Sequence, residues 1–202
     1  MKKFGLLFSI LIVMLANVIK AQTIFYQDFS SSNMLADYIG TGIQQFDEIT
    51  NSTGSSVALV SNALVLTRST GGSARYSKVT DLSAATINGM VFMFDLSVSG
   101  NSVAQTTAAT LNVGNGYSTG GTVTNATTFA KIGINLTTTN GTFALRDVTN
   151  GTNSANFSGT QTITWVMNTY TSGFTYLAPD NSTESIAANT WDLWVGTAKV
   201  FD

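Results

Sequence analysis

The feature that most constrains the fold is a repeated pattern of short apolar runs, each ended by turn residues. After residue 22, no window places apolar side chains at i, i+3, i+4 and i+7 over three turns, as an amphipathic helix requires. The runs are rich in β-branched and aromatic residues and are separated by Gly, Asn, Asp and Ser, which is typical of strands and turns. We expect strands at 24–29, 43–49, 56–60, 63–68, 74–79, 89–98, 107–113, 128–137, 142–147, 161–167, 174–178, 185–188 and 190–195.

Two local patterns extend this prediction to the architecture. Asn140-Gly141 is a strong hairpin signal because both residues accept positive φ, so 131–138 and 142–147 should pair. The run GMVFMFDLSV at 89–98 is apolar on both faces, which suits a central strand between two packed sheets. Many short antiparallel strands of this kind predict an all-β, two-sheet sandwich over residues 22–202. A turn at Gly196-Thr197 should begin a last hairpin whose second arm is 199–201.

The first 21 residues form a separate segment with the pattern of a secretory signal peptide. Lys2 and Lys3 precede an apolar stretch at 4–15, and Ala21 offers a small residue for cleavage before Gln22. A membrane anchor is the alternative, but the uninterrupted apolar run is shorter than the roughly 20 residues that a spanning helix needs. We therefore expect the chain to engage the export machinery and to be secreted or held at the cell surface, without a membrane anchor after cleavage.

The amino-acid composition indicates in which compartment the chain works and excludes some classes of binding partner. The chain has no cysteine, so it must be held by its core, and zero cysteine in an exported protein fits a bacterial source. Without Lys2, Lys3 and Lys20 it has six basic and eleven acidic residues, a formal net charge of −5. Such a chain does not attract nucleic acid or an anionic membrane. Its surface should instead consist of Thr, Asn, Ser and Gly, which hydrogen-bond well with water and sugars.

The residue types exclude most familiar catalytic sites. The absence of histidine and cysteine removes His-based triads, thiol nucleophiles and His-based zinc sites. Glycoside hydrolysis needs two carboxylates on one side of a groove. The closest pair, Asp47-Glu48, is adjacent on an expected strand and should point to opposite faces. We therefore expect a non-enzyme.

Strand alternation sorts the tryptophans and suggests a ligand site. Trp165 shares a face with Ile163 and Met167 and should be core. In 190–195, Trp191 falls on the apolar face and Trp194 on the face of Asp192. A flat ring beside an acceptor suits a sugar site, although a ring covered by a loop is the alternative. Polar positions opposite apolar faces could line the same groove: Arg75, Lys131, Asn135 and Arg146.

The segments TIFYQDFSS (23–31) and TITWVMN (162–168), with the block 170–202, carry a resemblance to a known family. They resemble concanavalin A-like (laminin G-like) jelly-roll modules of secreted Bacteroidota proteins, including type IX-secreted ones. The resemblance implies a jelly-roll sandwich and a closing strand after residue 202, so that this chain would be an N-terminal fragment of a parent with further domains. The hydrolase motif E-x-D-x-x-E of that fold is not matched.

The resemblance also implies a structural calcium ion near the chain ends, for which Asp28 is the candidate ligand. The alternative is that Asp28 only caps a turn. No cofactor is otherwise expected.

These observations favour a non-catalytic, exported β-sandwich module that binds polysaccharide or another glycan, or that serves as an accessory domain. The alternative is a structural or adhesive surface protein without a small ligand. A polysaccharide lyase or glycoside hydrolase of the same fold comes third.

Overall fold

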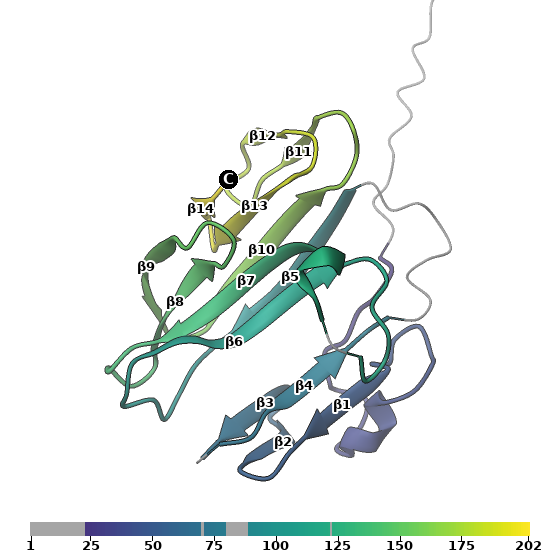
Figure 1. Cartoon of the computed structure of the whole chain (residues 1–202), viewed down its shortest axis with the longest axis vertical. Helices are drawn as coiled ribbons and strands as arrows, with labels where there is room; N and C mark the ends of the chain where they lie inside the picture. Colours follow the sequence, from purple (N-terminus) through teal and green to yellow (C-terminus); the bar gives the residue numbers. More distant parts are fainter. Residues whose placement is uncertain (1–22, 70, 80–88, 122) are drawn as a thin grey trace, which may run out of the picture.

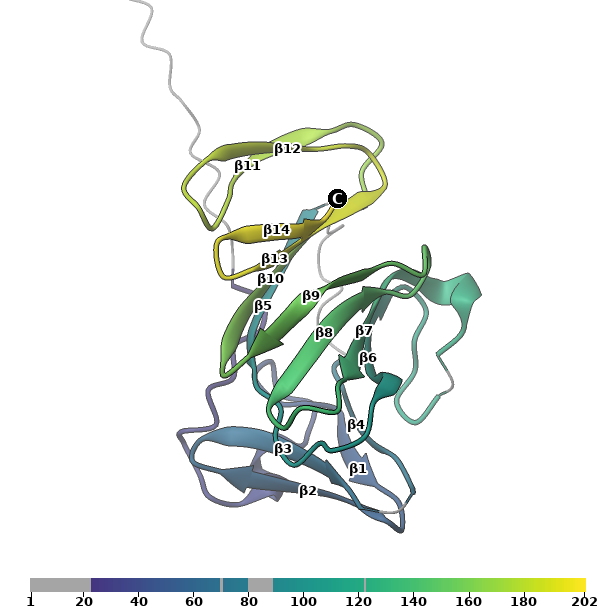
Figure 2. The ribbon, with the colours of Figure 1, turned by 90° about the vertical axis from the view of Figure 1, so that its left-hand side faces the viewer.

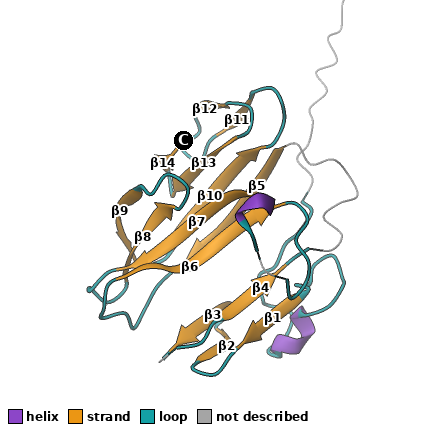
Figure 3. Cartoon of the chain, in the orientation of Figure 1, coloured by secondary structure: helices purple, strands orange, loops and turns teal. Residues whose placement is uncertain are grey.

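The computed structural model describes residues 23–69, 71–79, 89–121 and 123–202, and the predicted signal peptide lies outside them. The described residues are almost all in strands and turns, with two short 3-10 helices, η1 (Leu35–Tyr38) and η2 (Asn125–Thr127) (Figure 3). The strands are β1 (Glu48–Asn51), β2 (Ser55–Val60), β3 (Ala63–Arg68), β4 (Ala74–Ser77), β5 (Gly89–Leu96), β6 (Gln105–Gly114), β7 (Thr128–Leu136), β8 (Thr142–Asp147), β9 (Asn153–Ser158), β10 (Gln161–Asn168), β11 (Phe174–Leu177), β12 (Thr183–Ile186), β13 (Thr190–Val195) and β14 (Ala198–Phe201). The prediction of an all-β chain is confirmed.

Two four-stranded antiparallel sheets form the main body (Figure 1). One has the order β14-β13-β10-β5 and the other the order β6-β7-β8-β9. Their inner faces share one hydrophobic cluster, which includes Ile132 and Leu145 from the second sheet and Ile163, Trp165 and Leu193 from the first. The two sheets therefore pack as a sandwich. The second sheet is a meander of consecutive strands, and the jelly-roll connectivity stays a prediction.

A smaller unit lies beside the sandwich, built from β1–β4 and the segment around η1 (Figure 2). Strand β1 pairs with β4, and β2 pairs with β3. This unit has its own hydrophobic cluster around Tyr38, Phe46 and Ile49. The sandwich cluster draws its side chains from residues 90–201, so the two units have separate cores.

The hairpin β11–β12 lies over the outer face of the sheet β14-β13-β10-β5 (Figure 2). The Tyr176 hydroxyl on β11 contacts Trp194 and Asp192 on β13, and Glu184 on β12 contacts Lys199 on β14. This sheet is therefore covered on both faces along β13 and β14, whereas the outer face of β5 is left open.

Several strand predictions are correct, and some are not. Strands β8 and β13 have the predicted bounds, and the expected hairpins β7–β8 and β13–β14 are present. The expected strand at 24–29 is instead a loop. The Tyr26 N–H donates to the side-chain oxygen of Gln44, and the Gln27 side-chain amide donates to the backbone carbonyl of Gln44 at 2.8 Å. Most of 43–49 is also loop, since β1 begins at Glu48.

The expected central position of 89–98 is wrong, because β5 is an edge strand among the described residues. Its inner residues Met90, Phe92, Phe94 and Leu96 join the core. Its outer residues Val91 and Met93 are 59% and 66% exposed. In β5, the apolar pattern on both faces therefore belongs to a strand whose outer face is exposed, and not to a strand enclosed by two layers.

Candidate functional site

The expected sugar platform at Trp194 is buried. Trp194 and Asp192 lie on the outer face of β13, as alternation predicts, but are 2% and 3% exposed because the hairpin β11–β12 covers them. The ring is not presented to a ligand, so this part of the predicted site is corrected in favour of the covered alternative. Trp165 is fully buried as expected, and Trp191 is partly buried against the same core cluster.

Trp194 belongs to a polar cluster that fastens the hairpin to the sheet; we call it the hairpin cluster. The Trp194 indole N–H donates to the Tyr176 hydroxyl at 2.9 Å, and that hydroxyl donates to Asp192 at 2.6 Å. Lys199 bridges Asp192 at 3.1 Å and Glu184 at 3.0 Å. Its ammonium nitrogen lies 5.6 Å from the centroid of the Trp194 ring. The five residues form one connected network around a buried carboxylate.

The pKa shifts in the hairpin cluster have structural causes. Burial raises the pKa of Tyr176 to about 12, and the hydrogen bond to Asp192 adds to this effect. Burial acts to lower the pKa of Lys199, but its hydrogen bonds to Glu184 and Asp192 outweigh burial and leave the pKa above its ordinary value. Both groups are therefore protonated at neutral pH, as their roles as hydrogen-bond donors in this network require.

Lys131, Asn135 and Arg146, by contrast, come together on the outer face of the sheet β6-β7-β8-β9. Ile132, Ile134, Phe143 and Leu145 alternate with them and lie in the core, so these polar side chains point outward. Neighbouring strands add hydroxyl and amide groups to the same face. We call this surface the polar face; it comprises Thr110, Asn112, Lys131, Asn135, Arg146, Asn153 and Asn156.

The strand register sets the order of side chains on the polar face. Gly133 lies opposite Thr110 on one side and Arg146 on the other, and Arg146 lies opposite Asn153. A Cβ atom at Gly133 would lie 3.2 Å from Val148 and 3.3 Å from Thr107, whose methyl groups cover this position. Because residue 133 has no side chain, the methyl groups of Thr107 and Val148 can pack over β7 at this position.

Arg75 lies away from the polar face, on β4 of the smaller unit. Its guanidinium bonds to Glu48 Oε1 at 2.8 Å, and Glu48 Oε2 accepts a hydrogen bond from the Gly120 N–H at 3.0 Å. The hydrogen bond from Arg75 is the main cause of the lowered pKa of Glu48. Asp47 faces different partners, Lys78 and the N–H of Val79, so the expected divergence of Asp47 and Glu48 is confirmed.

Asp28 caps a turn in the structure. Its Oδ1 accepts hydrogen bonds from the N–H of Ser30 at 3.0 Å and from the Ser30 hydroxyl at 2.8 Å. These bonds lower the pKa of Asp28. Within the described ranges, no group of three or more carboxylate side chains gathers as a metal site would require. The turn alternative accounts for Asp28, and the calcium ion stays a prediction.

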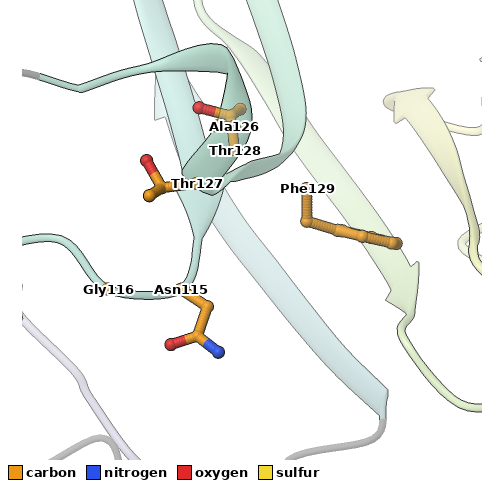
Figure 4. Close-up of a pocket in the computed structure, with 6 residues that line it drawn as sticks. All are labelled: Asn115, Gly116, Ala126, Thr127, Thr128 and Phe129. Atoms are coloured by element: carbon orange, nitrogen blue, oxygen red, sulfur yellow. The ribbon is translucent and has the colours of Figure 1, made fainter.

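Two surface hollows have the size of a site for a small ligand. One, of about 390 Å³, lies where β6 and β7 meet the loop that joins them and is lined by Asn115, Gly116, Ala126, Thr127, Thr128 and Phe129 (Figure 4). None of these side chains carries a charge. The other, of about 320 Å³, lies between β5, β10 and β11, with Val91, Met93 and Leu177 among its lining residues. Neither hollow is lined by a charged side chain, whereas the polar face carries Lys131 and Arg146.

Sequence reasoning missed Asn153, Tyr176 and Lys199 as members of these sites. Asn153 lies in β9, whose sequence NSANFS has too few apolar residues to be predicted as a strand. Tyr176 and Lys199 fall on predicted strands, and alternation gives their faces but not their partners.

Comparisons with models of protein families, with curated proteins and with solved structures return no match for this chain. The resemblance to concanavalin A-like modules therefore stays a prediction. Among the described residues, no helix has the length and apolar character to cross a membrane.

Proposed function

We propose that this chain is a non-catalytic β-sandwich module of an exported protein and that it binds carbohydrate on the polar face. The observation that carries the proposal is the gathering of amide, hydroxyl and cationic side chains from four adjacent strands on one sheet surface. Sugar hydroxyls need both donors and acceptors, and Asn side chains offer both in one planar group. The signal-like N-terminus and the resemblance to secreted modules support export.

The polar face also has the rigidity that a binding surface requires. Its residues are in strands, and Asn135 is held by hydrogen bonds on both sides of its amide, to the Thr107 N–H and to Asn153. A site on rigid strands loses little conformational entropy when a ligand binds. An extended sugar chain could lie across the strands and contact several of these groups at once.

The proposal is tested by substituting exposed members of the polar face. In the double variant Thr110→Met/Asn156→Met, apolar side chains replace hydrogen-bonding groups at two positions that are exposed. We expect the wild-type chain to bind one or more members of a soluble polysaccharide panel saturably in affinity electrophoresis, and the double variant to bind at least roughly tenfold more weakly.

Thr67→Met on β3 is the matched control, since Thr67 is exposed but lies in the smaller unit. It should bind as the wild type does. A panel without any saturable binding by the wild type, or equal loss in both variants, would contradict the proposal.

A second candidate function, self-association without a small ligand, is favoured by the edge of β5. This strand pairs with β10 over eight residues without a register shift, and it contains one charged residue, Asp95. The other sandwich edges are interrupted: the pairings of β6, β9 and β14 each contain a register shift. Long, regular and apolar edges invite the addition of another strand.

Met93→Lys tests this second candidate, because a lysine on an edge strand discourages pairing. We expect the wild type to associate in a concentration-dependent way in analytical ultracentrifugation and Met93→Lys to remain monomeric. Val103→Lys, on an exposed loop, is the control and should associate like the wild type. A wild-type chain that is monomeric at every concentration would remove this candidate.

A further inference from the structure

The distribution of ion pairs singles out two cations on the polar face. Six basic residues follow residue 22, and Arg75, Lys78 and Lys199 form salt bridges with carboxylates. Within the part of the chain that the structure describes, Arg68, Lys131 and Arg146 have no salt bridge. Two of these three unpaired cations share one sheet surface, although the chain as a whole is acidic.

Lys131 and Arg146 are diagonal neighbours on adjacent strands. Arg146 lies opposite Gly133, which is two residues from Lys131 on the same face of β7. Diagonal neighbours in a sheet are separated by roughly 7–8 Å between Cα atoms, within reach of two long side chains. One anionic sugar unit, or two successive ones, could therefore contact both cations.

Carboxylates are absent from the polar face itself. Asp147 is the single acidic residue in the sequences of β6, β7, β8 and β9, and it alternates with Arg146, so it points to the opposite side. Its oxygens accept hydrogen bonds from the N–H groups of Thr149 and Asn150 and from the Asn150 side chain. The Asp147 carboxylate therefore accepts hydrogen bonds within its own turn.

Arg146 is held in position by a chain of hydrogen bonds. The Thr107 N–H donates to Asn135 Oδ1 at 2.7 Å, and Asn135 Nδ2 donates to Asn153 Oδ1 at 3.0 Å. Arg146 Nη1 donates to the same Asn153 oxygen at 3.0 Å. A guanidinium has five N–H donors in a fixed plane. The hydrogen bond to Asn153 engages one nitrogen of the Arg146 guanidinium, so its other N–H groups can donate to a ligand.

We propose that the polar face selects acidic glycans and that Arg146 and Lys131 bind the carboxylates of their uronic acid units. The inference rests on the proposed function and names its ligand class. The planar guanidinium matches the two oxygens of a carboxylate, and such charge-assisted bonds are stronger than neutral ones. The amides of Asn135 and Asn156 then bond to the hydroxyl groups of the same or the next sugar unit.

The test compares polygalacturonate with its fully methyl-esterified form, which has the same backbone but no free carboxylate. We expect the whole chain to bind polygalacturonate at least tenfold more tightly in isothermal titration calorimetry, and the affinity to fall as salt is raised. Arg146→Gln and Lys131→Gln should each lose about tenfold or more for polygalacturonate, since each removes a charged hydrogen-bond donor.

Two further variants separate specific contacts from net charge and from misfolding. Arg68→Gln removes the third unpaired cation, on β3, and should bind as the wild type does. Arg146→Lys keeps the charge but loses the planar group, so its affinity should fall between those of the wild type and Arg146→Gln. Near-ultraviolet circular dichroism confirms that each variant is folded.

The outcomes distinguish this inference from the proposed function. Equal binding of the free and esterified polymers, or equal losses in Arg146→Gln and Arg68→Gln, overturns the acidic preference while carbohydrate binding stands. Binding to dextran sulfate but not to polygalacturonate overturns the assignment of uronic acids. An absence of binding to both polygalacturonate forms and to the neutral panel overturns both proposals.

Discussion

Trp194→Ala is expected to destabilise the protein by about 3–5 kcal/mol, because it removes a large, fully covered ring and leaves a cavity. The ring is 2% exposed, and the substitution also removes the N–H that donates to the Tyr176 hydroxyl. A loss of this size is a large part of the total stability of a typical domain. We expect the melting temperature to fall by roughly 10 °C or more in calorimetry.

Trp194→Phe is the matched control, since it keeps most of the ring volume but not the N–H. Its expected loss is about 1–2 kcal/mol. If Trp194→Ala instead melted like the wild type and lost only glycan binding, the ring would be a ligand platform, as alternation alone allowed.

Lys199→Met should be the second most damaging of the substitutions considered, because it leaves Asp192 buried without a cation. Asp192 is 3% exposed, and removal of one partner of a buried ion pair costs about 3–5 kcal/mol. The Lys199 side chain is 23% exposed, so solvent should reduce the loss to about 2–3 kcal/mol. Chemical denaturation at neutral pH, compared with the wild type, measures this difference.

Adding Asp192→Asn to Lys199→Met should restore part of the lost stability. The double variant removes the uncompensated charge, and the side-chain oxygen of the new asparagine can still accept a hydrogen bond from the Tyr176 hydroxyl. If the stability loss of the double variant equalled the sum of the losses in Lys199→Met and Asp192→Asn, Lys199 and Asp192 would not be coupled. The hairpin β11–β12 would then be held by the hydrogen bonds of Tyr176 and by packing, without a contribution from the Lys199–Asp192 ion pair.

Much of the fold could be predicted from sequence because alternation is a local property. The strands 142–147 and 190–195, the hairpins around Asn140-Gly141 and Gly196-Thr197, and the inward face of Trp165 all follow from residues close together in the chain. β9 escaped prediction because its pairing with β8, and not its own composition, makes it a strand.

The sites were harder to predict because they depend on which strands become neighbours. Alternation correctly placed Lys131, Asn135 and Arg146 on outward faces, but the pairing of β6 to β9 determines that these residues share one surface. The same limit applies to Trp194. Its position on the polar side of β13 is a local fact, whereas its burial depends on a hairpin that folds back over the strand.

We expect β1 to β4 and the segment around η1 to open without exposing the core of the sandwich, because the buried side chains of this unit form a cluster of their own. Glu48 links this unit to the loop between β6 and β7 through the Gly120 N–H, and that contact is partly exposed to solvent. Amide protons of β1 to β4 should then exchange with solvent through a local opening, at a lower free energy than those of β7, β8 and β10. The strands that carry the polar face would keep their arrangement while the smaller unit fluctuates.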